Sequence, residues 1–545
     1  MIMTLSGNII DVVAGRIFQG TVTVADGKIA SVEEHPVSET CYILPGLIDA
    51  HIHVESSMLI PSEFARLAVV HGTTATVSDP HEIANVLGTE GVKFMIANGK
   101  RVPFKFSFGA PSCVPATPFE TAGTRLGPED VEELLRLDDV KYLSEMMNFP
   151  GVINRDPEVM QKLEAAKKLG KPVDGHAPGL RGEAVRQYIA AGISTDHECY
   201  LLEEAVEKAE SGMKILIREG SAARNFDALS PMITSHPGQV MFCSDDRHPD
   251  DLAAGHINRI VARAIGERHD PVTVLRCCTL NPVRHYGLDS GLLQPGDPAD
   301  IVVVRTLEEF IPVSVYVNGT KVASEGVSLI RPVDETPRNR FDTRPVMPAH
   351  LEVPAAEGLI RVIQARDGQL VTGSAAVEPL VAGGRIVSDP ERDILKLVVV
   401  NRYQPSPPAI GFVKGFGLKS GAIASCVAHD SHNIVAVGTD DASLAHAVNL
   451  VIRGKGGIAA ATGVSGDLLP LPFAGIMSGM DGYHVAEQYR RLDRRAKEMG
   501  SPLRAPYMTL SFMALLVIPE LKLSDRGLFD GTGFAFVSLT ATRSL

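Results

Sequence analysis

Residues 46–289 alternate short apolar runs with longer helical segments, and this alternation constrains the fold more than any other feature of the chain. Eight of the runs have strand character, and helical segments such as PSEFARLAVVHG separate them. Their ends read DAHIHV, TATVSD, FKFSFGAP, VKYLSEM, PVDGH, ISTDH, MKILIR and VMFCSDD. Strand and helix alternating eight times are typical of a parallel (β/α)8 barrel, whose active site lies at the carboxyl ends of the strands. We therefore predict an α/β protein with such a barrel as its central domain.

The segments on either side of the predicted barrel read as short strands with glycine-containing turns. Residues 1–45 contain NIIDVVAGRIF and GTVTVADGKIASVEE. Residues 290–335 contain GDPADIVVVRTLEEFIPVSVYVNGTKVAS, with an Asn-Gly turn at Asn318 and Gly319. Because such a segment cannot bury a core alone, we expect the two to fold together into one composite β-sandwich, with the barrel inserted between them.

The remaining third of the chain predicts a further domain, since 545 residues are too many for one ordinary core. Residues 336–354 are rich in proline and charge, as is typical of a linker. Residues 355–545 mix strand-like runs such as ILKLVVVNRY with helical ones such as YHVAEQYRRLDRRAKEMG. We expect a C-terminal domain of α/β or α+β type.

Histidine and carboxylate residues end five of the eight predicted strands. Two of them, in LPGLIDAHIHVESS, lie two residues apart and so point to one face of an extended strand. Each residue alone has a structural explanation, such as a helix cap for Asp245 or a solvated charge for Glu145. Together they converge on one barrel mouth, and imidazole and carboxylate suit first-row divalent metals, with enough ligands for two ions that share a bridging carboxylate. The candidate ligands are His51, His53, Glu145, His176, His197 and Asp245.

Charge and cysteine content narrow the class of partner. The formal net charge of −13 disfavours nucleic acid and anionic membrane surfaces as partners, and favours a small substrate. Seven scattered cysteines without paired spacing are typical of reduced thiols in a cytoplasm. We also see no export signal and no apolar stretch of the roughly 20 residues that a membrane span needs. A symmetric homo-oligomer, most simply a dimer, is the base-rate expectation.

Several motifs together carry a resemblance to a known family. PGLIDAHIHVE, DGHAPG, TDHE, SDDRHPDDL and GDPADIVVV resemble the amidohydrolase superfamily, and GLKSGAIASCVAHDSHNIVAVGTDD resembles the extra C-terminal domain of its bacterial adenine deaminase family. The resemblance covers essentially the whole chain. It implies hydrolysis of adenine to hypoxanthine and ammonia with two divalent metal ions, Mn or Fe before Zn. It further implies that His51, His53 and Asp245 hold one ion and that His176 and His197 hold the other.

The bridging ligand and the proton-transfer groups have alternatives at this point. Glu145 matches the adenine deaminase pattern for the bridge, whereas many members of the superfamily use a carbamylated lysine, for which Lys141 is the candidate. Asp245 is expected to take a proton from the attacking water and pass it to the leaving amine. Either Glu198 or Glu82 could protonate the purine ring, and the sequence does not choose between them.

Other polar residues near the predicted strand ends have weaker assignments. Asp79 and His81 could be ligands, could orient ligands, or could open a helix at Asp79-Pro80. The HDSHN motif in the C-terminal domain could bind an extra metal, close the purine pocket, or form a structural network. Residues that either line the pocket or brace the structure around it are Arg218, Ser244, Asp246, Arg247, His429, Asp430 and His432.

Two other functions remain compatible with the same sequence. A cyclic amidohydrolase of the dihydroorotase or hydantoinase type would keep the barrel and change the substrate. A non-catalytic barrel scaffold would be expected to lose metal ligands, and none of the six candidates is missing.

Overall fold

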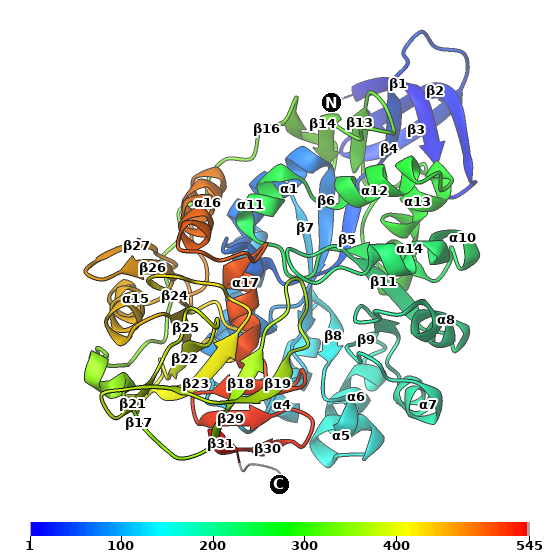
Figure 1. The fold of residues 1–545 in the computed structure, drawn as a ribbon. Coiled ribbons are helices and arrows are strands. Elements are labelled where there is room, and N and C mark those ends of the chain that lie inside the picture. The colour runs from blue at the N-terminus through cyan, green and yellow to red at the C-terminus, as the bar shows by residue number, and fades with distance from the viewer. Residues whose placement is uncertain (1, 542–545) are drawn as a thin grey trace.

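A computed structural model describes residues 2–541 of the chain (Figure 1). Its centre is the predicted barrel, because all eight sequence runs form parallel strands. Five pair in the order β5-β6-β7-β8-β9 and three in the order β10-β11-β12. Parallel bridges from Val173 to Ile193 and from Ile52 to Asp245 join the two sets into a closed ring. The strands are β5 (Leu47–Ile52), β6 (Thr73–Ser78), β7 (Lys105–Ala110), β8 (Val140–Met146), β9 (Val173–Gly175), β10 (Thr195–Asp196), β11 (Lys214–Arg218) and β12 (Val240–Cys243).

Helices follow the barrel strands and surround them. In α6, for example, the side chain of Asp156 accepts hydrogen bonds from the backbone nitrogens of the first turn, Pro157 opens the helix, and two lysines lie in its last turn. The helices of this region are α1 (Pro61–Ala68), α2 (His81–Leu87), α3 (Thr89–Gly99), α4 (Pro128–Leu135), α5 (Phe149–Ile153), α6 (Pro157–Lys168), α7 (Gly182–Ala190), α8 (Leu202–Glu210), α9 (Phe226–Leu229), α10 (Pro231–Ser235), α11 (Pro249–Ala254), α12 (Ile257–Gly266), α13 (Pro271–Cys277) and α14 (Leu280–Tyr286), with 3-10 turns η1 (Val54–Ser57) and η2 (Val69–His71).

Three pairings of barrel strands are irregular, and two of them involve strands that carry candidate ligands at the barrel mouth. The register of β5 against β6 shifts between Asp49 and Ile52. The register of β8 against β9 shifts between Leu143 and Met146. Such bulges re-aim side chains near active sites. They fall beside the candidate ligands of these two strands.

One eight-stranded sheet combines strands from both flanks of the barrel, so the blue and green strands lie side by side at the top of Figure 1. Its order is β16-β15-β14-β13-β4-β1-β2-β3, and residues from both sequence segments share one buried apolar core. The predicted turn at Asn318 and Gly319 joins β14 to β15, and both residues have positive φ, as a two-residue hairpin turn of type I′ requires. The strands are β1 (Ile2–Asp11), β2 (Arg16–Ala25), β3 (Lys28–Glu34), β4 (Tyr42–Pro45), β13 (Ile301–Val304), β14 (Pro312–Val317), β15 (Thr320–Ser324) and β16 (Val327–Ser328).

A largely antiparallel sheet dominates the C-terminal third, which is therefore of the α+β type. Its order is β19-β18-β23-β22-β25-β24-β26-β27, with β31 also paired to β18, and only β18 and β23 run parallel. The helix α15 packs on this sheet in a core of its own. The sheet strands are β18 (Leu359–Gln364), β19 (Gly373–Val377), β22 (Leu395–Val400), β23 (Ala409–Lys414), β24 (Ala422–Ser425), β25 (Ile434–Gly438), β26 (Ile458–Thr462), β27 (Ser465–Leu469) and β31 (Thr540–Ala541).

The C-terminal third also packs against the barrel, because its helix α16 contacts α1 and α11 (Figure 1). One hydrophobic core includes residues of both regions, among them Phe94 and Phe473, whose rings stack. Within residues 2–541, no helix combines the length and apolar character that crossing a membrane requires. The remaining elements are η3 (Pro348–Leu351), β17 (Val353–Pro354), β20 (Leu380–Ala382), β21 (Arg385–Val387), α15 (Asp441–Gly454), α16 (Gly482–Glu498), α17 (Pro506–Ser511), η4 (Phe512–Ala514), β28 (Leu521–Ser524), β29 (Gly527–Asp530) and β30 (Ala535–Phe536).

Candidate metal centre and active site

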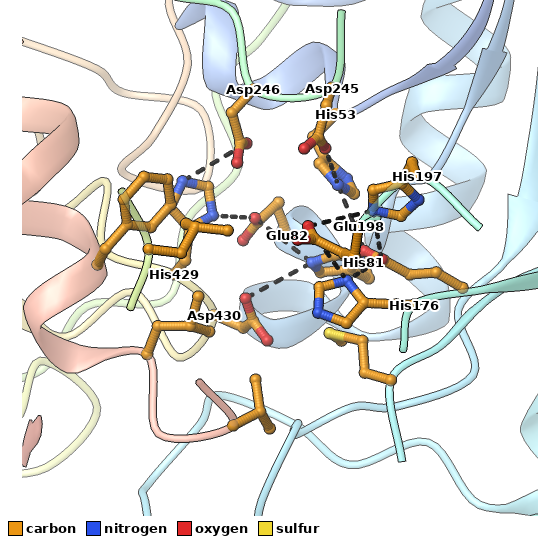
Figure 2. A pocket seen from close by; sticks show the side chains of 16 residues that line it. His53, His81, Glu82, His176, His197, Glu198, Asp245, Asp246, His429 and Asp430 are labelled. Atoms are coloured by element: carbon orange, nitrogen blue, oxygen red, sulfur yellow. Dashed lines mark hydrogen bonds and ion pairs between the residues drawn. The ribbon is translucent and has the colours of Figure 1, made fainter. Parts of the chain in front are cut away.

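A cavity of about 360 Å³, its open side included, lies at the carboxyl ends of the barrel strands. Histidines and carboxylates of the barrel line one side (Figure 2). The C-terminal third supplies the other side through the residues Leu370, His429, Asp430, Phe512, Leu515 and Val517. The mouth of the barrel is therefore covered by the second region of the chain.

The six predicted metal ligands converge beneath this cavity, and we call them the barrel cluster. His51 leaves β5 and is fully buried, and His53 follows the end of that strand. Asp245 follows β12, and its Oδ1 lies 3.6 Å from His51 Nε2 and 3.1 Å from His53 Nε2. Asp245 has φ of 54°, and its backbone nitrogen donates a hydrogen bond to the carbonyl of His51, so barrel closure holds it against the strand β5.

Glu145 lies between two halves of the barrel cluster, the first formed by His51, His53 and Asp245 and the second by His176 and His197. Its Oε1 is 3.4 Å from His53 Nε2, whereas its Oε2 is 2.8 Å from His176 Nδ1 and 3.2 Å from His197 Nε2. A carboxylate with one oxygen toward each half has the position that a bridging ligand needs. Lys141, the alternative bridge, is exposed and donates its Nζ hydrogen to the carbonyl of Asp138 at 2.7 Å. It lies outside the cavity.

The donor atoms of the barrel cluster are suited to divalent cations. Ligand atoms of His51, His53 and Asp245 lie within 4.8 Å of one another, as do those of His51, Glu145 and His197. Both ring nitrogens of His51 and the Nε2 of His176 are buried without a hydrogen-bond partner. Such unpartnered buried nitrogens are costly unless something else binds them. Burial also lowers the pKa of His51, which keeps its ring in the neutral form that binds metals.

Arg218 braces Asp245 from the side away from the histidines. Its Nη1 donates to Asp245 Oδ2 at 2.6 Å and also to Glu198 Oε1, and its Nη2 donates to Glu198 Oε2 at 3.2 Å. Burial opposes ionisation of Asp245, but Arg218 and the neighbouring histidines His51 and His53 together outweigh burial and hold the pKa of that carboxyl well below its usual range. Both oxygens of Glu198 are therefore occupied by one guanidinium, and Arg218 orients residues that line the cavity without lining it itself.

A second group of polar residues lies where the barrel meets the C-terminal third, and we call it the junction cluster. Its centre is Glu82, whose two oxygens form close ion pairs with His429 Nδ1 and His432 Nε2. Burial opposes ionisation of Glu82, but His429 and His432 outweigh it and lower the pKa of that carboxyl well below its usual range. The full junction cluster is His81, Glu82, Asp246, His429, Asp430 and His432, all of them near Glu82 or His429.

His81 connects the two clusters (Figure 2). Its Nδ1 lies 3.4 Å from Glu145 Oε1 and 3.2 Å from Asp79 Oδ2, and its Nε2 lies 3.4 Å from Glu82 Oε1. Asp79 also accepts a hydrogen bond from the backbone nitrogen of His81 at 3.1 Å, at the start of α2. Asp79 thus accepts a hydrogen bond at the start of α2 and lies beside the His81 ring, a position that fits two of the alternatives left by the sequence.

The structure separates the weaker sequence assignments. Asp246 lines the cavity, 3.6 Å from His429 Nε2, and accepts a hydrogen bond from the Ser56 hydroxyl at 2.5 Å. Arg247 does not line it, because its guanidinium donates to the carbonyls of Glu219, Asp251 and Gly255 and so braces the loop after β12. Ser244 likewise faces away, donating from both its backbone nitrogen and its hydroxyl to Asp49.

Sequence reasoning did not identify the apolar wall of the cavity. Leu370, Phe512, Leu515 and Val517 line it. The Phe512 ring stacks on His429 with centroids 5.3 Å apart. These side chains stand in loops and a short 3-10 turn without a recognisable motif, so only the packing of the C-terminal third against the barrel reveals their role.

Comparisons with known proteins agree with this architecture. Residues 42–322 match the model of the Amidohydrolase family, and residues 369–535 match that of the Adenine deaminase C-terminal domain. The protein named adenine deaminase from Salinibacter ruber is 58% identical over 536 residues, which cover 98% of each chain. Proteins of the same name from Methanosarcina acetivorans and Sulfurovum sp. are 54% and 53% identical over 98% of this chain and 99% of their own length. The chain belongs to the amidohydrolase family, in the branch whose members also carry the adenine deaminase C-terminal domain.

Proposed function

We propose that this protein hydrolyses adenine to hypoxanthine and ammonia. The observation that carries the proposal is the 58% identity to a protein named adenine deaminase over 98% of both chains. The balanced reaction adds one water to adenine, forms a bond from its oxygen to carbon 6, and breaks the bond from carbon 6 to the amino nitrogen. The site needs a group that moves a proton between these two atoms.

We propose that the barrel cluster holds two divalent metal ions, with His51, His53 and Asp245 on one side, His176 and His197 on the other, and Glu145 shared. Imidazole and carboxylate ligands suit Mn or Fe, and Zn is the alternative. When bound, such ions supply positive charge and lower the pKa of a coordinated water toward neutrality. The unpartnered ring nitrogens of His51 and the position of Glu145 support this assignment.

We assign the proton transfer to Asp245. Its Oδ2 accepts from Arg218 and its Oδ1 faces the histidines, so the carboxylate stays ionised until a proton arrives from the attacking water. It then donates that proton to the amino nitrogen, which leaves as ammonia. Arg218 fixes the orientation of the carboxylate during both transfers.

We assign the hydrogen bond to the purine ring nitrogen to Glu82 rather than to Glu198. The oxygens of both carboxylates are held, but by different partners. The partner of Glu198 is the Arg218 guanidinium, which does not release a proton, whereas the partners of Glu82 are the imidazoles of His429 and His432. A proton passed from one of these imidazoles to Glu82 gives a carboxyl group that can donate to the ring nitrogen. Negative charge that develops on ring nitrogen 1 during attack at carbon 6 is then neutralised by a proton from Glu82, which His429, whose pKa the nearby carboxylates raise to about 9 against the effect of burial, can supply.

The same proposal covers the organisation and setting of the chain. Residues 46–289 form the catalytic unit, residues 1–45 and 290–335 the composite β domain, residues 336–354 the link to the next domain, and residues 355–545 the C-terminal domain, whose described part covers the barrel mouth. Residues 1 and 542–545 of these ranges lie outside the described residues. All seven cysteines are free, six of them buried, which supports a reducing cytoplasm. We expect a homodimer, with adenine as the small-molecule partner and neither nucleic acid nor membrane involved.

The test is release of ammonia and formation of hypoxanthine from adenine by protein reconstituted in parallel with Mn(II), Fe(II) or Zn(II). Turnover that depends on the ion supplied is the expected result. Dihydroorotate and hydantoin serve as controls, because ring opening of either without adenine turnover would move the chain to the cyclic amidohydrolases. The exposed position of Lys141 argues against the lysine-bridged centre typical of that class. Turnover of none of these substrates by metal-loaded protein would favour the non-catalytic scaffold.

A further inference from the structure

Lys522 differs in its partners from the other buried lysines of residues 2–541. It lies on β28 and is fully buried, yet no carboxylate of the described chain forms an ion pair with it. Three other lysines are buried, and each has a carboxylate partner. The Nζ-to-oxygen distances are 3.1 Å for Lys162 and Glu158, 2.8 Å for Lys208 and Asp196, and 2.5 Å for Lys396 and Asp441.

The partners of Lys522 are two backbone carbonyls from separate segments. Its Nζ donates to the carbonyl of Leu370 at 2.8 Å and to that of Phe512 at 2.9 Å. Burial lowers the pKa of Lys522 to about 7, and both the ammonium and the neutral amine have enough N–H donors for two carbonyls. An unpaired buried amino group costs free energy that an apolar residue of similar length would avoid. Stability alone therefore does not explain the residue at this position.

Both carbonyls belong to residues that line the cavity. Phe512 begins the turn η4, and its ring stacks on that of His429 at an interplanar angle of 29°. Leu515 and Val517 follow in the same segment and line the cavity as well. The segment that contains Leu370 has a second contact with β28, besides the one from Lys522, because the Thr372 hydroxyl donates to the carbonyl of Leu521 at 2.9 Å. Lys522 thus joins two segments of the cavity wall from behind.

We propose that Lys522 is a positioning residue for the substrate, which sets the apolar wall of the cavity by tying the Leu370 and Phe512 segments together. The inference rests on the proposed function, because the wall faces the substrate of that reaction. Lys522 touches neither the barrel cluster nor the cavity itself. Its loss should therefore weaken substrate binding more than it slows the chemical steps.

The test is the substitution Lys522→Met, which keeps the length of the side chain and removes both hydrogen bonds. We expect KM for adenine to rise about tenfold, kcat to stay within threefold, and bound metal per chain to be unchanged. The matched control is Lys396→Met in the same domain, whose Nζ contacts the carbonyl of Leu351 and Asp441, neither of which lines the cavity. The control should leave KM within twofold even if it lowers Tm.

An unchanged KM in Lys522→Met, or an equal rise in Lys396→Met, would overturn the proposal, because either result reduces Lys522 to a purely structural role. If Lys522→Met does not fold, Lys522→Gln supplies a shorter, neutral donor, and its KM should be raised by a smaller factor. An unaltered KM in a folded Lys522→Gln protein would equally overturn the assignment.

Amide hydrogen exchange in the metal-loaded protein without substrate separates this proposal from the proposed function. In Lys522→Met, peptides covering residues 366–372 and 510–518 should exchange at least fivefold faster, while peptides of β5 and β12 keep their rates. Unchanged exchange rates in these two peptides would show that Lys522 does not hold the two segments of the cavity wall together. Failure of the wild-type protein to turn over adenine would refute the proposed function and leave the exchange result intact.

Discussion

The barrel cluster and the junction cluster have similar side chains and different construction. All residues of the barrel cluster come from the ends of barrel strands, so closure of one ring of strands brings them together. The junction cluster combines residues after β6 and β12 with residues 429–432 of the C-terminal third. It forms only where the two regions pack against each other. Under the proposed function, metal binding belongs to the part of the molecule that barrel closure builds, and binding of the purine ring to the part that packing of the two regions builds.

Asp245 and Asp246 are adjacent in sequence and belong to different clusters, which makes them the sharpest test of this division. We expect Asp245→Asn to lower kcat/KM for adenine about 10³-fold, because the amide cannot take the proton of the attacking water. Asp246→Asn should lower it only about tenfold, since Asp246 pairs with His429 and Ser56. Steady-state kinetics at equal metal loading measures both. Equal losses of kcat/KM in the two variants would show that the barrel cluster and the junction cluster do not have separate roles.

Most of the barrel cluster could be predicted from sequence because its geometry depends on short-range rules. His51 and His53 share one strand end, and parallel strands in a barrel bring Glu145 and Asp245 to the same mouth. What the sequence left open was the choice between Glu145 and Lys141. That choice depends on the direction of each side chain on β8, where the register shift between Leu143 and Met146 lies.

Metal content tests whether the barrel cluster alone binds the ions, and the carboxylates to compare are Glu145 of the barrel cluster and Glu82 of the junction cluster. Glu145→Gln should reduce bound metal from two ions to one or none and lower kcat about 10²-fold or more, because one ligand shared by both halves is lost. Glu82→Gln should keep both ions and lower kcat about tenfold to 10²-fold, in line with the loss of a proton-transfer group. Elemental analysis of dialysed protein gives the metal content. Loss of metal in Glu82→Gln would show that residues of both clusters hold the metal ions.

The junction cluster and the apolar wall could not be predicted from sequence alone, because no local pattern relates segments hundreds of residues apart. The HDSHN motif marked His429 and His432 as chemically notable, but their partner Glu82 lies 347 residues from His429 in the chain. Lys522 carries no motif, and its role follows from two carbonyl contacts that only tertiary packing creates. Long-range docking, rather than strand or helix propensity, decides these positions.

Removal of metal should destabilise the barrel cluster specifically. Without cations, the buried imidazoles and carboxylates lose partners that offset their desolvation. We therefore expect chelation to lower Tm by about 5 °C, as for two ions each present at about a hundred times its dissociation constant. Glu82→Gln should retain this shift, and Glu145→Gln should show a smaller one. The shift in Tm is measured by thermal unfolding with and without chelator, and again after the protein is reloaded with metal. An equal shift in both variants would contradict the division of roles.

The smallest effect we expect concerns Glu120, a buried carboxyl beside the junction cluster. Burial, followed by the nearby charge of Asp430, raises its pKa from 4.5 to about 8. Because the folded state then binds the proton more tightly than the unfolded state, stability is unaffected below pH 4.5, falls as pH rises from 4.5 to about 8, and changes no further above that pH. Glu120→Gln should remove this loss and stabilise the protein by about 2 kcal/mol at pH 8, with no gain at pH 4. Denaturant unfolding at both pH values, with the exposed Glu164→Gln as control, measures the difference. A gain of equal size at both pH values would mean that packing, and not the negative charge gathered where the two regions meet, sets the stability at this position.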